Sequence, residues 1–240
     1  MHNQAAISFH DTLASRWEDE YKSKAFGARL AVISALIPEQ LRGQNWMDAG
    51  CGTGTISRWL AGERGTSVLA IDGSDNMLAH ASAAEGVQYR KADIVCTGLP
   101  DKSFDGIVCS SVLEYLVSPE LALKEFHRLL KPGGALLVSV PNGAMSVRVP
   151  LNFVYWVTRP LGKRRRAAYL DHSKHSYSFV QFSDILRRSD FAVDRMVEYG
   201  RFVLPMGIPV SRSGILIMAL ARKPQPGVCG QQSSPSLASQ

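Results

Sequence analysis

The chain has 240 residues, which is long enough for one well-buried α/β domain and short for two independent domains. Apolar residues make up 45% of the sequence and charged residues 20%, values that are ordinary for a soluble globular protein. No apolar run reaches the roughly 18–20 residues that span a bilayer, and residues 1–9 lack a basic region followed by an apolar core, so neither a membrane span nor a secretory signal is expected.

The positive charge is confined to one stretch of the chain. The formal net charge is +6, and residues 141–170 contain no acid but carry Arg148, Arg159 and the basic run 163–166. The rest is therefore close to neutral, and we expect no nucleic-acid partner. The four cysteines form no Cys-x-x-Cys pair, so no zinc site or disulfide framework is expected, and a reducing cytoplasmic compartment fits best.

The hydrophobic pattern predicts strands and helices in alternation. Helical spacing predicts a helix over 10–37, ended by Pro38, and helices that begin at Thr55 and after an N-capping Ser74. Further helices are expected over 119–131, ended by residues 132–134, and over 179–188. Short apolar runs predict strands over 44–48, 67–71, 87–90, 104–109, 135–140, 191–199 and 215–221. This order indicates a largely parallel sheet with helices on both faces.

The alternation is interrupted after the fifth strand. We expect residues 1–223 to form a single domain, with a helical cap over 1–38 and an acceptor-side insertion over 141–176. Such an insertion lies above the carboxyl ends of the strands, where ligands of open α/β sheets bind. Residues 224–240 are rich in Pro, Gly, Ser and Gln and are expected to be disordered.

A glycine-rich loop follows the first expected strand and opens a helix. Gly50, Gly52 and Gly54 form the pattern G-x-G-x-G, in which the missing Cβ atoms let the backbone turn tightly and approach a ligand. The dinucleotide fingerprint G-x-G-x-x-G needs glycine where Thr55 stands, so a pyrophosphate fits poorly. S-adenosylmethionine (AdoMet) carries an ammonium and a sulfonium, which Asp48 at the strand end would favour. A glycine turn without a ligand is the alternative.

Polar residues at the ends of the next strands complete the expected cofactor site. Asp72 is placed to accept from both hydroxyls of an adenosine ribose, as an acid does in dinucleotide sites, and Asp93 from the adenine amino group. Ile94 and Met77 are candidates to pack on adenine, and Ser110 ends the fourth strand at the ligand crevice. The alternatives are a capping role for Asp72, a loop role for Asp93 and a core position for Met77.

These segments resemble the class I AdoMet-dependent methyltransferases, especially the small-molecule branch that includes ubiquinone and menaquinone biosynthesis enzymes. The matching stretches lie within residues 40–142, at 48–54, 71–74 with 77–78, 92–93, 104–105 with 112–114, and 129–134. The resemblance implies a Rossmann-like, seven-stranded mixed sheet whose last strand is antiparallel, with an inserted cap after strand 5. It also implies that Asp48, Gly50, Asp72 and Asp93 touch AdoMet. The further candidates for cofactor binding are Gly52, Gly54 and Gly73.

Two further features of the N-terminal half bear on the comparison with these methyltransferases. The quinone O-methyltransferases typically carry His after Val-Leu-Glu, and this chain has Tyr115 there. An N-terminal helix folds over the cofactor in the wider family, which makes Trp17 and Tyr21 candidates to cover it; packing of these two aromatics against the sheet is the alternative.

Candidate acceptor-side residues lie within the insertion. Methyl transfer from a sulfonium needs a general base only for an acceptor that must lose a proton, and His172 and His175 are candidates for that base. Loop histidines without chemistry are the alternative. The carboxylate-rich clustering of a magnesium site is missing, so no metal is expected.

The insertion also contains an apolar stretch, 149–157, that precedes the basic run 163–166. We expect residues 149–166 to cover a bulky acceptor or to make weak peripheral contact with an anionic membrane surface. An extra helix packed on the domain, with a solvated basic end, is the alternative.

The sequence as a whole predicts a cytoplasmic methyltransferase that acts on a small or lipid-like organic acceptor, at oxygen rather than nitrogen. A nucleic-acid methyltransferase is the first alternative, although the Asn/Asp-Pro-Pro-aromatic motif of base-amino methylation is replaced by Ser110-Ser111-Val112-Leu113. A nicotinamide oxidoreductase is disfavoured by Thr55, and a non-catalytic AdoMet-binding module is the remaining alternative.

Overall fold

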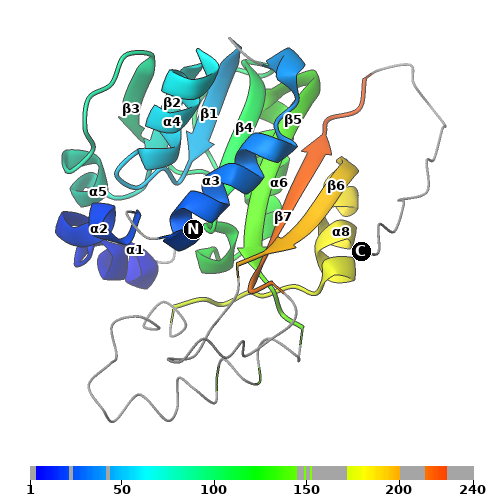
Figure 1. The fold of residues 1–240 in the computed structure, drawn as a ribbon. Helices are drawn as coiled ribbons and strands as arrows, with labels where there is room; N and C mark the ends of the chain where they lie inside the picture. Colours follow the sequence, from blue (N-terminus) through cyan, green and yellow to red (C-terminus); the bar gives the residue numbers. More distant parts are fainter. Residues whose placement is uncertain are drawn as a thin grey trace.

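A computed structural model describes residues 4–21, 24–41, 44–144, 149, 152, 172–200 and 214–225. Within them, seven strands form one sheet in the order β3-β2-β1-β4-β5-β7-β6 (Figure 1). The strands are β1 (Asn45–Ala49), β2 (Ser67–Asp72), β3 (Val87–Lys91), β4 (Phe104–Ser110), β5 (Leu130–Pro141), β6 (Ala192–Tyr199) and β7 (Leu216–Arg222). β7 runs antiparallel to β5 and β6, and the other neighbours pair in parallel. This confirms the expected mixed Rossmann-like sheet.

Helices cover both faces of the sheet. On one face, α3 (Lys24–Leu36) and α4 (Thr55–Arg64) bury apolar residues against Trp46, Val68 and Leu137. On the other face lie α6 (Pro119–Leu129) and α8 (Phe179–Arg188). The shorter elements are α1 (Gln4–Asp11), η1 (Ala14–Arg16), α2 (Trp17–Tyr21), η2 (Glu39–Leu41), α5 (Asp75–Ala79) and η3 (Leu113–Tyr115).

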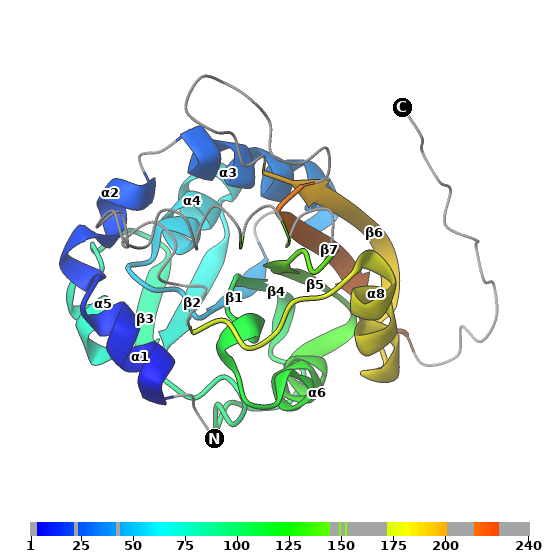
Figure 2. The ribbon, with the colours of Figure 1, turned by 90° about the horizontal axis from the view of Figure 1, so that it is seen from below.

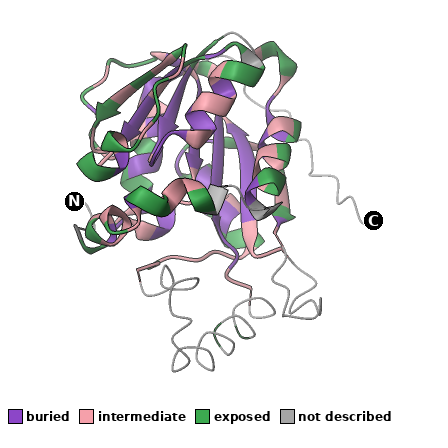
Figure 3. Ribbon diagram, turned by 60° about the vertical axis from the view of Figure 1, so that its left-hand side comes forward, coloured by how far each residue is buried: buried purple, intermediate pink, exposed green. Residues whose placement is uncertain are grey.

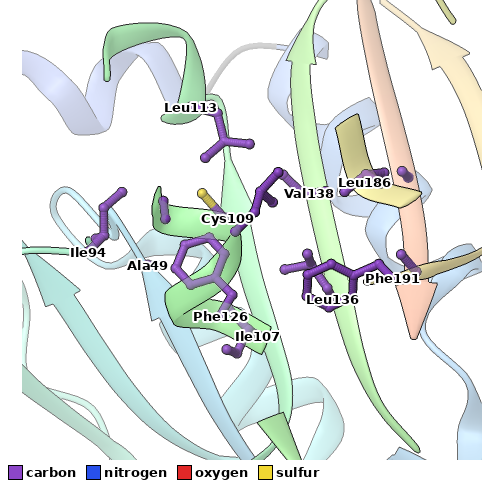
Figure 4. Close-up of a cluster of buried hydrophobic side chains, with 14 of the residues drawn as sticks. Ala49, Ile94, Ile107, Cys109, Leu113, Phe126, Leu136, Val138, Leu186 and Phe191 are labelled. Carbon is purple, nitrogen blue, oxygen red and sulfur yellow. The ribbon is translucent and has the colours of Figure 1, made fainter. Parts of the chain in front are cut away.

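The larger of two hydrophobic clusters holds the α6 and α8 face together. Phe126 of α6 and Leu186 of α8 are fully buried against Cys109, Leu136 and Val138 of the sheet (Figure 4). The central strands are mostly buried, the edge strands β3 and β6 are largely exposed, and the outer surfaces of the helices are exposed (Figure 3). This alternation of buried and exposed positions is what the strand and helix periodicities predicted, and it makes a rigid base for the loops at the strand ends.

Two expected boundaries were wrong. The helix expected over 10–37 is interrupted: α1 starts at Gln4 and ends at Asp11, where the Thr12 hydroxyl donates to the carbonyl of Phe9 at 2.7 Å and competes for a helical acceptor. The helix expected over 119–131 ends at Leu129, and β5 already begins at Leu130.

Residues 131–134 form an irregularity inside β5 instead of a turn before it. The register with β4 passes from the pair Phe104↔Leu130 to the pair Gly106↔Ala135. Gly133 has a φ of 80°, which glycine adopts without strain, and its amide donates to the carbonyl of Lys223 at 2.9 Å. The loop is therefore tied to the residue that follows β7.

Several expectations concern residues outside the described part of the chain. Most of the insertion over 141–176, including 153–171 with the basic run 163–166, lies outside it, as do residues 226–240 of the expected tail. The single-domain boundary 1–223 and the N-terminal cap over 1–38 remain predictions.

Candidate active site

The glycine loop joins β1 to α4, as the sequence predicted. Gly50, Gly52 and Gly54 have φ values of 77°, 56° and 82°, a region that residues with a side chain rarely adopt. A Cβ at Gly50 would lie 2.5 Å from the Val112 side chain, and one at Gly54 would lie 2.2 Å from the Tyr89 hydroxyl. The backbone amides of Gly50 and Cys51 donate to the carbonyl of Ile71 at 2.8 and 3.0 Å, which fixes the loop beside the end of β2.

Two carboxyl groups flank this loop in a buried environment. Asp48, at 2% exposure, accepts a hydrogen bond from the Ser57 hydroxyl at 2.6 Å. Burial raises the pKa of Asp48 to about 7, and the nearby Asp72 adds to the effect. The two oxygens of Asp72 accept from the amides of Gly52 and Ser74, both at 2.8 Å, and burial raises the pKa of Asp72 as well.

This pair of acids fits a cationic ligand. Burial without a compensating positive charge disfavours the ionised form of both carboxyl groups. A ligand that carries an ammonium and a sulfonium would favour the ionised form again. A pyrophosphate would add negative charge to the same place. The glycine cradle and the two acids are therefore matched to AdoMet, with Asp48 and Asp72 as the residues that would hold it.

The expected adenine-side residues lie at the ends of β2 and β3. Ser74 caps α5, since its hydroxyl accepts from the amide of Met77 at 2.9 Å, as the sequence predicted. Gly73 lies between Asp72 and this cap. Met77 is 2% exposed and Ile94 is 4% exposed, so both belong to the packed base of the site. Asp93 accepts from the amide of Val95 at 2.9 Å, which fixes its carboxyl group within its own loop.

Polar side chains gather where β4 and β5 end. The hydroxyls of Ser110 and Ser139 are 3.2 Å apart, and Ser139 is completely buried. Ser111 adopts a φ of 57°, which is strained for a residue with a side chain, and its amide donates to the Ser139 hydroxyl at 3.0 Å. Glu114, in the following η3 turn, is also buried. These residues lie at the carboxyl end of the sheet, where ligands of open α/β sheets bind.

The N-terminal helices lie over the glycine loop. Asp11 of α1 accepts from the Ser74 hydroxyl through its carboxylate, and its backbone carbonyl accepts from the Asn76 side chain at 3.1 Å, so α1 is held to α5. Trp17 covers Gly52 so closely that a Cβ there would lie 3.2 Å from the indole nitrogen. Figure 2 shows α1, α2 and α5 together at one side of the carboxyl ends of the strands. The side chain of Tyr21 lies outside the described part.

Known proteins that resemble this chain in sequence are methyltransferases. A family profile described as "Methyltransferase domain" matches residues 47–138. The ubiquinone biosynthesis O-methyltransferase of Idiomarina loihiensis is 29% identical over 198 residues, which cover 78% of this chain and 77% of the relative. The protein of the same name from Pseudomonas paraeruginosa is 33% identical over 150 residues, 58% of this chain and 64% of the relative. The chain is an AdoMet-dependent methyltransferase, similar to the ubiquinone biosynthesis O-methyltransferases.

Solved structures share the fold of this methyltransferase. One structure, of a methyltransferase in complex with a methyltransferase activator from Haloferax volcanii, superposes with a TM-score of 0.71 at 16% identity. The match covers 90% of this chain and 98% of the other. At that identity the likeness concerns the fold alone, which is the arrangement that places the glycine loop and the ends of β2 and β4 side by side.

The two histidines predicted on the acceptor side lie on a segment that crosses the carboxyl ends of the strands (Figure 2). The ring of His172 stacks on Phe9 of α1, with centroids 4.3 Å apart. His175 donates through Nε2 to the carbonyl of Leu116 at 3.0 Å. The amide of Lys174 donates to the carbonyl of Glu114 at 2.8 Å, so this segment of the methyltransferase is anchored on η3.

A third imidazole, which the sequence reasoning did not select, lies in the same place. His10 of α1 packs against Trp17 and Tyr115, with ring centroids 5.4 and 4.8 Å away. Its position depends on the turn after Asp11 and on the docking of α1 on α5, and no local motif marks either feature. The quinone O-methyltransferases typically carry His where this chain has Tyr115 of η3. In this chain the imidazole beside that position belongs instead to His10 of α1.

The described residues offer neither a metal cluster nor a membrane span. They contain no group of three or more His, Cys, Asp or Glu side chains placed to hold a metal ion. No helix among them is both long enough and apolar enough to cross a membrane.

Proposed function

We propose that this methyltransferase transfers the methyl group of AdoMet to an oxygen atom of a small or lipid-like organic acceptor that carries a hydroxyl. One observation carries the proposal: imidazoles and aromatic rings, from His10 and Trp17 to Tyr115 and His172, gather above the cation-favouring glycine loop. A hydroxyl must lose its proton when it is methylated, and imidazole is the side chain suited to accept a proton near neutral pH.

Methyl transfer mainly requires the protein to align the acceptor oxygen with the methyl group and to exclude water. Bound AdoMet supplies an electrophilic methyl group on a sulfonium. Asp48 and Asp72 would hold the cationic and ribose parts of the cofactor, and the strained turn at Ser111 would position the acceptor-facing end of β4. Phe9, Trp17 and His172 would close the site against water, which strengthens the electrostatic interactions inside it.

The names of the relatives support oxygen as the methylated atom. Both relatives described above are named ubiquinone biosynthesis O-methyltransferases, and the alignment with the first spans about three quarters of each chain. The sequence Ser110-Ser111-Val112-Leu113 after β4 differs from the motif of enzymes that methylate base amino groups. We therefore place the acceptor among hydroxylated aromatic or lipid-like molecules and not among nucleic acids.

We also propose that residues 149–166 cover an apolar acceptor and make weak, reversible contact with anionic lipid on the cytoplasmic side of a membrane. The support is the sequence: an apolar, aromatic stretch precedes the basic run 163–166. Aromatic side chains favour the interface, and each basic side chain near an anionic surface contributes about 1 kcal/mol.

The test is product analysis with methyl-labelled AdoMet. The full chain is incubated with the labelled cofactor and either a metabolite extract or a panel of catechols with and without a prenyl tail. We expect label on an organic product, joined through oxygen, together with S-adenosylhomocysteine (AdoHcy). Label found only on nucleic acid, only on nitrogen, or no turnover with any acceptor would contradict the proposal.

A further inference from the structure

His10 lies between the cofactor loop and the acceptor side. Its ring is half-buried and makes edge-to-face contacts with Trp17, which covers Gly52, and with Tyr115, which follows β4. The neighbouring Phe9 ring contacts His10 edge to face, and the ring of His172 stacks on Phe9. The carboxylate of Asp72, at the end of β2, is close enough to act on its charge. The imidazole is therefore enclosed by α1, Trp17 of α2, β2, η3 and the end of the insertion.

The hydrogen bonding of His10 determines which ring nitrogen carries the proton. Nδ1 lies 2.7 Å from the carbonyl oxygen of Ala6, one helical turn earlier. A carbonyl oxygen only accepts, so Nδ1 must be the N–H donor. In the neutral ring, Nε2 then holds a lone pair, and it has no hydrogen-bond partner among the described residues. His175 is arranged the other way, because its Nε2 donates to the carbonyl of Leu116.

Burial is what keeps this lone pair available to accept a proton. Burial, the largest influence, lowers the pKa of His10 below its usual 6.5, and the neighbouring His172 lowers it further. The Ala6 carbonyl and the carboxylates of Asp72 and Asp11 act in the opposite direction without reversing the shift. Burial thus favours the neutral form of the ring, which can accept a proton.

We propose that His10 is the general base of this methyltransferase, with Nε2 accepting the proton of the acceptor hydroxyl. The inference rests on the proposed function, because it needs a hydroxyl acceptor. In the step, the O–H bond breaks and its proton goes to Nε2, while the freed electron pair forms the O–CH₃ bond. The S–CH₃ bond breaks and its electron pair returns to sulfur, which leaves AdoHcy. The imidazolium then passes its proton to water. Phe9 and His172 hold the ring in place.

Kinetics on three variants of the full chain test the proposal. His10→Gln removes the base, and His10→Phe removes it while keeping an aromatic ring against Tyr115 and Trp17. The matched control is His80→Gln, since His80 at the end of α5 also has Nδ1 2.8 Å from the carbonyl four residues earlier but is exposed. The acceptor is catechol, or whichever hydroxyl compound proves best in the product analysis. AdoHcy affinity is measured for each variant to show that the cofactor site is intact.

We expect both His10 variants to lose about 10²–10⁴-fold in turnover, the usual contribution of a positioned base, while binding AdoHcy within threefold of the parent. In the parent, turnover should fall as pH drops through an inflection below 6.5, and the remaining activity of the variants should lack that inflection. His80→Gln should behave like the parent. Parent-like turnover of His10→Phe would mean that the ring serves only in packing, and would overturn the proposal.

Nuclear magnetic resonance of histidine-labelled protein supplies a readout that does not depend on turnover. With AdoHcy bound, the His10 signals, assigned by their loss in His10→Gln, should show the Nδ1–H tautomer and a pKa below 6.5. Catechol should shift the Nε2 signal of His10 and leave His80 unmoved. The Nε2–H tautomer, or an unmoved Nε2 signal at catechol concentrations that support methylation, would overturn the proposal. A normal His10 response without any O-methyl product would instead contradict the proposed function.

Discussion

The rings of Phe9 and His172 stack with their centroids 4.3 Å apart and their planes inclined by 24°. This contact joins the first helix to the end of the insertion, across the carboxyl ends of the strands. The helix α1 and the segment that contains His172 thus support each other. A substitution in one of them should therefore alter the position of the other.

The stack itself can be tested at His172. His172→Ala should lower turnover several-fold, because α1 and the ring of His10 lose their support, while AdoMet affinity changes little. His172→Phe keeps a flat ring for Phe9 and should recover most of the activity. Steady-state kinetics with calorimetric AdoMet binding measure both. An inactive His172→Phe variant with normal AdoMet binding would assign the chemistry to His172 itself.

Asp72 should contribute directly to cofactor affinity. Asp72→Ala removes the acceptor of the Gly52 and Ser74 amides as well as the proposed ribose contact. We expect AdoMet binding to weaken by about 1–3 kcal/mol, the typical cost of leaving buried polar partners unpaired. The control is Asp75→Ala, because Asp75 is exposed and pairs with Lys91 on the surface. Calorimetry with AdoMet and NAD is the measurement, and equal AdoMet affinity in both variants would remove Asp72 from the site.

The buried carboxyl of Asp48 should make AdoMet binding depend on pH. Its pKa is raised to about 7 by burial, so below that pH the ligand-free site holds a neutral acid, whereas a cationic ligand requires the carboxylate. Affinity should therefore fall by up to about tenfold per pH unit below 7, with protons released on binding. Asp48→Asn should bind weakly with a shallower pH dependence. Affinity in the parent that stays constant from pH 5.5 to 8 would contradict this.

The same group should affect the stability of the ligand-free protein. The folded-state pKa of about 7 lies above the usual 3.8, so between these values the folded state keeps a proton that the unfolded state has lost. The free energy of unfolding contributed by Asp48 must then decrease as pH rises from about 4 to about 7. Denaturant melts at pH 5 and 7.5 should show Asp48→Asn gaining stability mainly at the higher pH. An equal gain at both pH values would argue against a raised pKa.

Glycine substitutions in and beside the cofactor loop should have opposite effects. An alanine at position 54 would have to adopt a φ of 82°, and its Cβ would lie 2.2 Å from the Tyr89 hydroxyl. Gly54→Ala should lower stability by at least about 1–2 kcal/mol, the cost of the left-handed backbone alone, and weaken AdoMet binding. A Cβ at Gly62, inside α4, would meet no atom within 4 Å, so Gly62→Ala should stabilise by about 0.5–1 kcal/mol. Thermal melts with and without AdoMet compare the two.

Membrane contact through residues 149–166 should be electrostatic. Co-sedimentation with anionic vesicles should be stronger than with neutral vesicles and should weaken with salt, since exposed charges are screened over about 10 Å at 0.1 M. A variant with Lys163, Arg164, Arg165 and Arg166 changed to Gln should lose most of the binding. Binding that ignores lipid charge, or that is equal in both proteins, would leave a soluble acceptor as the better interpretation.

The cofactor half of the site could be predicted from sequence because its determinants are local. A glycine pattern between a strand and a helix, with Asp48 and Asp72 at strand ends, depends on a few neighbouring residues. Even the Ser74 cap follows from one side chain and the next turn. The resemblance to class I methyltransferases adds the antiparallel last strand, which no local pattern contains.

The acceptor half could not be predicted to the same depth. The position of His10 depends on the end of α1 and on the docking of Asp11 at Ser74, 63 residues later in the chain. The start of β5 was misplaced because Pro132 and Gly133 usually end a helix, whereas here they form an irregularity held by Lys223. Contacts between residues far apart in sequence decided both cases.

The place of β7 between β5 and β6 has a consequence for synthesis of the chain. β6 pairs with β7 and with no other strand of the described sheet, yet residues 216–222 are made after residues 192–199. A growing chain therefore carries β6 without its neighbour until the last strand leaves the ribosome. Unpaired strands readily pair with strands of other chains. The nascent protein is therefore exposed to aggregation while β6 is unpaired. In a chain truncated before Leu216, β6 would remain unpaired permanently.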